Sequence, residues 1–93
     1  MSSKRMRYRD LERIVRGFSN HRRIQVLDTL EKYPKLSVLE ISKELKVNFK
    51  TIAEHVRRLA AAGLVDKQNV NRDVRHTLTS LGKHTLKFLK ELE

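Results

Sequence analysis

The chain has 93 residues, with 21 Lys and Arg against 11 Asp and Glu and a formal net charge of +10. A chain of this length can bury only one core, so we expect a single domain. The absence of Cys excludes disulfides, thiolate metal sites and a Cys nucleophile. No apolar run approaches the ~18 residues of a membrane span, and no apolar signal segment follows the basic start. We therefore expect a cytoplasmic protein without a membrane partner. Its charge points first to nucleic acid and second to an anionic membrane surface, and charge alone does not choose between them.

Apolar residues at helical spacing begin at Leu11 and predict a first helix, after a basic arm at residues 1–10. This arm either follows a nucleic-acid backbone or is simply solvated. Ser19 or Asn20 can cap a second helix, which the single Pro ends. The folded domain is expected to span residues 11–93.

The third and fourth helices are predicted from their capping residues. Ser37 is followed three residues later by Glu40, which is the capping-box arrangement at the start of a short helix. Asn48 can cap the next helix, which ends at Gly63. The predicted inward residues of this fourth helix are Phe49, Ile52, Val56 and Leu59.

Beyond the fourth helix the apolar period changes from that of a helix to that of a strand. Val74, His76 and Leu78 alternate with polar residues, and a polar turn at residues 71–73 precedes them. This pattern predicts a half-buried hairpin over residues 64–78.

A last helix, capped by Thr79 or Ser80, is expected to run to Glu93. The predicted order is α-α-α-α-β-β-α. Consecutive helices with a tight break before the fourth, followed by a two-stranded hairpin, predict a winged helix-turn-helix, which is mainly α with a small β-hairpin.

Five short segments follow one another along the chain: Arg23–Leu27, Ile41–Asn48, Thr51–Leu59, Ala62–Val65 and Leu78–Gly82. In sequence and spacing they resemble the ArsR-type (arsenic-repressor-like) winged-helix transcription regulators of archaea and bacteria, over roughly residues 11–93. The resemblance implies that Gly82 lies inside a helix and permits close approach of the hairpin or a neighbouring helix. Lys46 stands where the family has Gly, and a left-handed backbone would strain it. The hairpin tip also lacks Gly, which leaves its turn type open.

Polar side chains cover the outward face of the predicted recognition helix, residues 48–62, because a rotation of about 100° per residue separates them from its apolar residues. Lys50 and Arg58 can donate to guanine or phosphate, and Thr51 can meet a thymine methyl. Glu54 can accept from a cytosine amine, but we favour its pairing with a neighbouring Arg on the helix. The residues of this helix predicted to contact DNA are Asn48, Lys50, Thr51, Glu54, His55, Arg57 and Arg58.

Arg72 and Arg75 are the Arg residues of the predicted wing, residues 64–78. Arg at a wing tip suits insertion into a narrow, electronegative minor groove, while charge protection of a short exposed strand is the open alternative. Ser37 and Lys46 flank the helix-turn-helix and are expected near phosphates, with the Ser37 cap supplying a helix N-terminus.

Four His residues raise the question of a metal site, because some members of the resembled family bind zinc or metalloids. The Cys pair of the metalloid site would fall near residues 37–39, where no Cys occurs, and His84 has Lys87 nearby. We therefore expect neither a metal nor another cofactor. We interpret His76 as a partly buried strand residue. For His55 the resemblance implies packing or phosphate contact.

The last helix carries two apolar stripes, whereas a single small domain needs only one. We therefore expect one stripe to face the core and the other a second subunit, with the first helix joining this contact as the resemblance implies. The residues predicted at this homodimer contact are Leu11, Val15, Phe18, Leu81, Phe88, Leu89 and Leu92. A monomer with a broadly buried last helix is the alternative.

No Gly-rich phosphate loop or nucleophile–base arrangement can be assembled, so we expect no enzyme. Our leading hypothesis is a homodimeric, sequence-specific regulator of transcription on double-stranded DNA, associated with the nucleoid. Its recognition helix 48–62 would occupy the major groove and its wing 64–78 the minor groove or backbone. The alternatives are a nonspecific architectural or chromatin protein and a winged-helix protein-interaction module. The operator and any small-molecule effector stay open.

Overall fold

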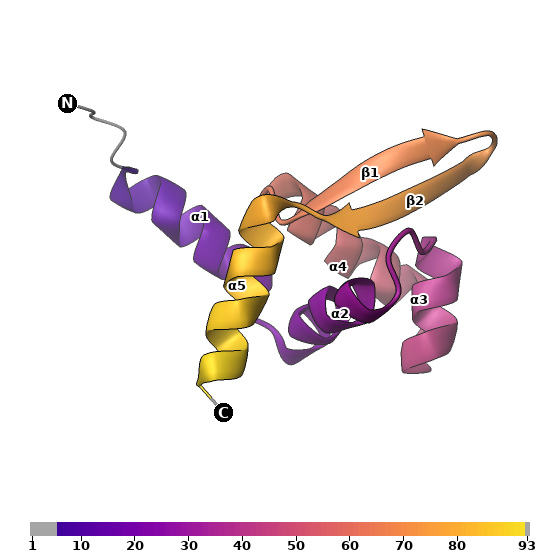
Figure 1. Cartoon of the computed structure of the whole chain (residues 1–93), viewed down its shortest axis with the longest axis horizontal. Helices are drawn as coiled ribbons and strands as arrows, with labels where there is room; N and C mark the ends of the chain where they lie inside the picture. Colours follow the sequence, from indigo (N-terminus) through magenta and orange to yellow (C-terminus); the bar gives the residue numbers. More distant parts are fainter. Residues whose placement is uncertain (1–5, 93) are drawn as a thin grey trace.

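The computed structural model describes residues 6–92, and its elements follow the predicted order (Figure 1). They are α1 (Tyr8–Phe18), α2 (His21–Lys32), α3 (Val38–Leu45), α4 (Phe49–Ala61), β1 (Val65–Val70), β2 (Asp73–Leu78) and α5 (Ser80–Glu91). The two strands form an antiparallel hairpin. The order α-α-α-α-β-β-α confirms the winged helix-turn-helix.

The bounds of the two terminal helices differ from those expected. The first helix begins at Tyr8, so the last residues of the expected basic arm form its first turn. Residues 1–5 of that arm, and the predicted helix end at residue 93, lie outside the described residues. The last helix ends at Glu91.

Side chains cap the helices where the sequence predicts them. Asn20, rather than Ser19, accepts from the backbone N–H groups that open α2. Ser37 and Glu40 form a complete capping box at the start of α3. Thr79 accepts from the Gly82 N–H at 2.9 Å and opens α5. These contacts span two or three residues, which is why the local sequence predicts them.

The core lies around α2, which Figure 1 shows between α5 and α3. Its fully buried apolar side chains come from α2, α3, α4, the root of the wing and α5: Val26, Leu27, Leu30, Ile41, Ile52, Val56, Leu59, Leu64, Val65 and Leu86. An ion-pair group also joins α5 to α2, because Lys90 Nζ lies 2.8 Å from Glu31 Oε1 and 3.1 Å from Asp28 Oδ1. The core therefore fixes the position of α4 relative to the hairpin.

Phe49 was predicted to point inward, and this expectation is wrong because the side chain is 50% exposed. It is the first residue of α4, directly after the Asn48 cap. The helix turn that carries it projects beyond the core, so periodicity alone misplaced it.

Candidate nucleic-acid interface

A tight turn joins α3 to α4 and sets the angle between the two helices of the helix-turn-helix. Lys46 ends α3 in the left-handed conformation, at φ 56° and ψ 44°, and its N–H bonds to the Ser42 carbonyl. The structure thus places a side chain where the resembled family has Gly, at a backbone cost of roughly 1–2 kcal/mol. Asn48 then opens α4, with its Oδ1 accepting from the N–H groups of Lys50 and Thr51 at 2.8 and 3.4 Å.

The exposed N-terminal half of α4 presents Lys50 and Thr51 to solvent, as predicted. Within residues 6–92, Lys50 makes no ion pair, so its ammonium group is available to a base or a phosphate. Asn48 differs from Lys50 and Thr51 because its side-chain oxygen Oδ1 is already used in the helix cap. Its side-chain N–H groups remain as donors. We call the exposed side of α4 that carries Lys50, Thr51, Glu54, Arg57 and Arg58 the outward face.

Glu54 organises two arginines on the outward face. Arg57 donates to both of its carboxylate oxygens at 2.9 and 2.7 Å, and Arg58 Nε donates to Oε2 at 2.7 Å. These hydrogen bonds lower the pKa of Glu54 to about 2, so the carboxylate is ionised at neutral pH. The predicted pairing is confirmed. Because each guanidinium has five N–H donors, most remain for a phosphate or a base edge.

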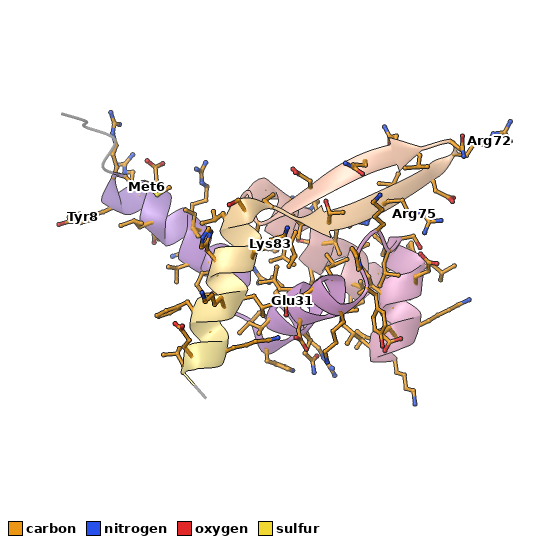
Figure 2. All side chains as sticks on the ribbon, in the orientation of Figure 1. Met6, Tyr8, Glu31, Arg72, Arg75 and Lys83 are labelled. Carbon is orange, nitrogen blue, oxygen red and sulfur yellow. The ribbon has the colours of Figure 1, made fainter. Side chains whose placement is uncertain are left out.

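Arg72 lies at the tip of the wing, and its side chain extends away from the body of the protein (Figure 2). The hairpin reverses at Asn71 and Arg72, where Asn71 takes a φ of 59°. Asn tolerates this left-handed conformation, which explains how the tip turns without Gly. Arg72 is exposed to solvent and pairs with no carboxylate in the described part of the chain.

Arg75 points back toward α3 instead. Its Nη1 lies 2.9 Å from Glu40 Oε1 and donates to the Lys35 carbonyl at 3.2 Å, while Nη2 lies 3.0 Å from Asp73 Oδ2. Its side chain is 30% exposed. Arg75 therefore ties the wing to the start of α3, and these bonds leave fewer of its N–H donors available for DNA than those of Arg72.

A groove of about 570 Å³ separates α4 from the wing. Ser37 lines it at the start of α3, Arg57 and Phe49 on α4, and Lys67 and Arg72 on the hairpin. The exposed Phe49 ring gives this basic groove an apolar wall. Sequence reasoning missed Phe49 as a surface residue, although its place directly after a helix cap was a usable signal. The groove brings three predicted contacts together: Ser37, Arg57 and Arg72.

His76 anchors the root of the wing rather than a ligand. It is 2% exposed, and its Nδ1 lies 2.9 Å from the Leu36 carbonyl oxygen, which also accepts from the His76 N–H at 3.0 Å. Burial lowers the pKa of His76, although its hydrogen bond to Leu36 opposes that effect. The interpretation of His76 as a strand residue is confirmed, and its side chain is almost completely rather than partly buried.

This burial predicts a loss of stability in mild acid. The unfolded chain binds a proton at His76 near pH 6.5, whereas the folded chain, with its lowered pKa, resists protonation. The stabilising contribution is therefore present above about pH 6.5 and is lost as pH falls toward the folded pKa. We expect the urea midpoint to drop between about pH 7.5 and about pH 5.5. His76→Gln should reduce this drop, whereas His84→Gln, on exposed α5 surface, should leave it; an equal drop in all three proteins would contradict the assignment.

His55 is half-buried and lies off the outward face. Burial lowers the pKa of His55, and the positive charge of Arg23 on α2 lowers it further. Its Nδ1 is buried and has no hydrogen-bond partner within residues 6–92. Of the two roles implied for His55, the structure supports packing.

The predicted dimer contact divides into two groups. Leu11, Val15, Phe88 and Leu92 are exposed, by 44, 51, 55 and 67% respectively. Phe18 and Leu81 instead pack against the core, and Leu89 is half-buried. Leu81 packs against the core because it lies in the first turn of α5. Thr79 holds this turn at the root of the wing by donating to the Gly63 carbonyl at 2.7 Å. We call the four exposed residues the apolar strip.

The described residues contain no group of three or more metal-ligating side chains. His84 Nδ1 lies 2.9 Å from the Ser80 carbonyl within its own helix. None of the helices within residues 6–92 is both long and apolar enough to cross a membrane.

Known proteins share this sequence pattern and this fold. The model of the arsR family of bacterial regulatory proteins matches residues 20–67, just over half of the chain. HlyU of Vibrio cholerae, solved in its reduced form, is 27% identical, with a TM-score of 0.77 over 90% of this chain and 88% of that chain. No curated protein sequence matches the chain.

Two more distant structures show the same fold. The homodimeric winged helix-turn-helix DNA-binding domain of Mb0332 from Mycobacterium bovis, a possible ArsR-family transcriptional regulator, is 18% identical, with a TM-score of 0.83 over 99% of this chain and 89% of that chain. FabT of Streptococcus pneumoniae in complex with DNA is 23% identical, with a TM-score of 0.70 over 76% of this chain and 52% of that chain.

Proposed function

The chain belongs to the arsR family of bacterial regulatory proteins, and from this premise we propose that it is a homodimeric, sequence-specific transcription regulator of double-stranded DNA. The recognition helix α4 enters the major groove, and the wing contacts the minor groove or backbone. Fold and family are those of transcriptional regulators.

The outward face of α4 is the observation that carries this proposal. Lys50 and Thr51 sit in its first turn, the part of a recognition helix that reaches base edges. Arg57 makes a bidentate contact to Glu54, which favours one orientation of its guanidinium before DNA arrives. A pre-positioned set of donors and a methyl group can discriminate base pairs, whereas nonspecific binding requires only cations.

The groove between α4 and the wing supports a path for one DNA strand. Ser37, Arg57, Lys67 and Arg72 place polar and cationic groups along it. The Ser37 cap lies at the N-terminus of α3, where backbone dipoles favour a phosphate. We therefore assign the backbone to this groove and Arg72 to the flanking minor groove or its phosphates.

The apolar strip on α1 and α5 supports the homodimer. Its four side chains are each between 44 and 67% exposed, and they belong to the two terminal helices that the resemblance assigns to the dimer contact. Mb0332, which shares the fold, is homodimeric. A twofold dimer would present its two recognition helices to successive major grooves, about 34 Å apart.

Footprinting on DNA from the region upstream of its own coding sequence tests the specific part of the proposal. We expect a bounded, pseudo-palindromic footprint and an affinity at least 10³-fold above that for random duplex, on the order of other specific regulators. Equal affinity for random duplex would instead establish a nonspecific architectural binder. A failure to bind any duplex at about 50 mM salt would indicate a protein-interaction module.

The two wing arginines should behave differently in salt titrations. Replacing Arg72 with Gln should weaken binding to all sequences similarly and reduce the slope of log K against log salt by about one, because one phosphate contact is lost. Arg75→Gln should leave the slope unchanged, since Glu40, Asp73 and the Lys35 carbonyl already hold its guanidinium. Thermal melting of both variants would control for a displaced wing. An unchanged slope in Arg72→Gln would remove the wing tip from the interface.

A further inference from the structure

Five arginines from three helices line one small pocket where α1 meets the C-terminal half of α4. We call this pocket, of about 240 Å³, the arginine corner; its cations are Arg13, Arg16, Arg23, Arg57 and Arg58. The volume is enough for a phosphate group. The corner lies outside the groove under the wing, and only Arg57 lines both.

Close backbone packing builds the corner. A Cβ at Gly17 would collide with Ala62 Cβ, so α1 can approach the end of α4 only because this residue is Gly. Arg23 Nη1 then donates to the carbonyls of Arg16 and Gly17 at 2.8 and 3.2 Å, which closes the C-terminus of α1. Arg23 Nε is buried and has no acceptor among the described residues.

The corner has more guanidinium groups than carboxylates to neutralise them. Glu54 serves both Arg57 and Arg58. On α1, Asp10 lies 3.8 Å from Arg13, and Glu12 lies 3.2 Å from Arg16. Five cations thus face three anions.

The two α1 pairs are also weak. The side chains of Arg13 and Arg16 are 66 and 78% exposed, and ion pairs at such positions contribute little. The paired N–H donors of arginine match the geometry of a phosphate, which can accept from several guanidinium groups at once.

The two faces of α1 point in different directions. At about 100° per residue, Arg13 and Arg16 lie across the helix from Leu11 and Val15. The apolar strip can therefore be covered by a second subunit while the arginines stay beside α4. Because Arg57 and Arg58 also belong to the outward face, the corner continues the surface that we assign to DNA.

We propose that the arginine corner binds a backbone phosphate of duplex DNA, so that α1 adds a phosphate contact to those of the recognition helix and wing. This inference rests on the proposed function. It assigns Arg13 and Arg16, on a helix otherwise expected only to dimerise, to the DNA interface.

The test compares two double variants with the same loss of charge. Arg13→Gln with Arg16→Gln removes the α1 side of the corner. Lys83→Gln with Lys87→Gln is the matched control, because these lysines line a different pocket, against α2 and β2. Sedimentation and thermal melting would establish that both proteins stay dimeric and folded.

We expect the corner variant to lower the slope of log K against log salt by about one to two. Its loss of affinity between about 50 and about 200 mM salt should then be smaller than that of wild type by about 3-fold per lost contact. The control variant should keep the wild-type slope. The same slope in corner variant and wild type, or an equal fall in both variants, would overturn the inference while leaving the proposed function intact.

A titration of the DNA-free protein with inorganic tripolyphosphate separates the two sources of phosphate. Weak, salt-sensitive binding fits a site that acts on DNA. Tight binding that the corner variant abolishes, together with an unchanged DNA slope, would make the corner a site for a free anion and overturn its role on DNA. Wild-type protein that binds no duplex at all would instead overturn the proposed function itself.

Discussion

Replacing Phe88 with Glu should leave the protein monomeric and lower its affinity for a palindromic duplex by about 10²–10⁴-fold. Phe88 is 55% exposed on α5, and Leu92 one turn later is 67% exposed. In a twofold dimer the new carboxylate would be buried against apolar residues of the partner, with no cation from the apolar strip to pair with it. Without the dimer each half-site is bound separately, and the avidity from linked binding is lost.

Sedimentation at micromolar concentration and titration of duplexes carrying one or two half-sites would measure both effects. Affinity for a single half-site should change little, because Phe88 lies outside the groove and the arginine corner. Lys87→Glu is the matched control, since Lys87 is its exposed neighbour in sequence on the same helix but lines the pocket against α2. A Phe88→Glu protein that remains dimeric would place the subunit contact elsewhere.

The parts of this fold that the sequence predicts are those set by short-range contacts. The capping box joins Ser37 to Glu40, and Thr79 caps Gly82, each over three residues. Such contacts leave a signature in the spacing of residues. The spacing therefore predicts the start of every helix except the first to within a residue or two. The Glu54 pairing with Arg57 was also predictable, because one helical turn brings them together.

Contacts between distant segments account for what spacing could not predict. Arg75 meets Glu40 across 35 positions of sequence, and this bond between the wing and α3 has no signature in local spacing. Phe18 and Val15 belong to the same predicted apolar stripe of the first helix, yet Phe18 packs on the core and Val15 faces solvent. Each outcome depends on which neighbour the fold supplies.

The candidate site divides in the same way. The outward face of α4 follows from one helical period and was predicted nearly in full. The arginine corner combines side chains from α1, α2 and α4, and no single segment shows its charge surplus. His55, predicted at the interface from its place on α4, is half-buried, because packing between helices covers part of its side chain.

Gly82→Ala should destabilise the protein by up to about 2 kcal/mol, although Ala normally favours a helix over Gly by about 1 kcal/mol. A Cβ at this position would collide with the Leu64 carbonyl oxygen, which also accepts from the Thr79 N–H at 3.1 Å. Backbone at the root of the wing cannot move aside as a side chain can, so the overpacking cost of about 1–3 kcal/mol exceeds the gain in helix propensity.

Thermal and urea unfolding would measure this cost, with an expected fall in melting temperature of about 10 °C for a domain of this size. Ser80→Ala, two residues earlier and exposed, is the control for helix propensity without a collision. A more stable Gly82→Ala protein would show that the backbone at the wing root moves aside at little cost. If that backbone stays in place, α5 must shift. That helix carries Phe88 and Leu92, so the same substitution should also weaken the dimer and, through it, binding to paired half-sites.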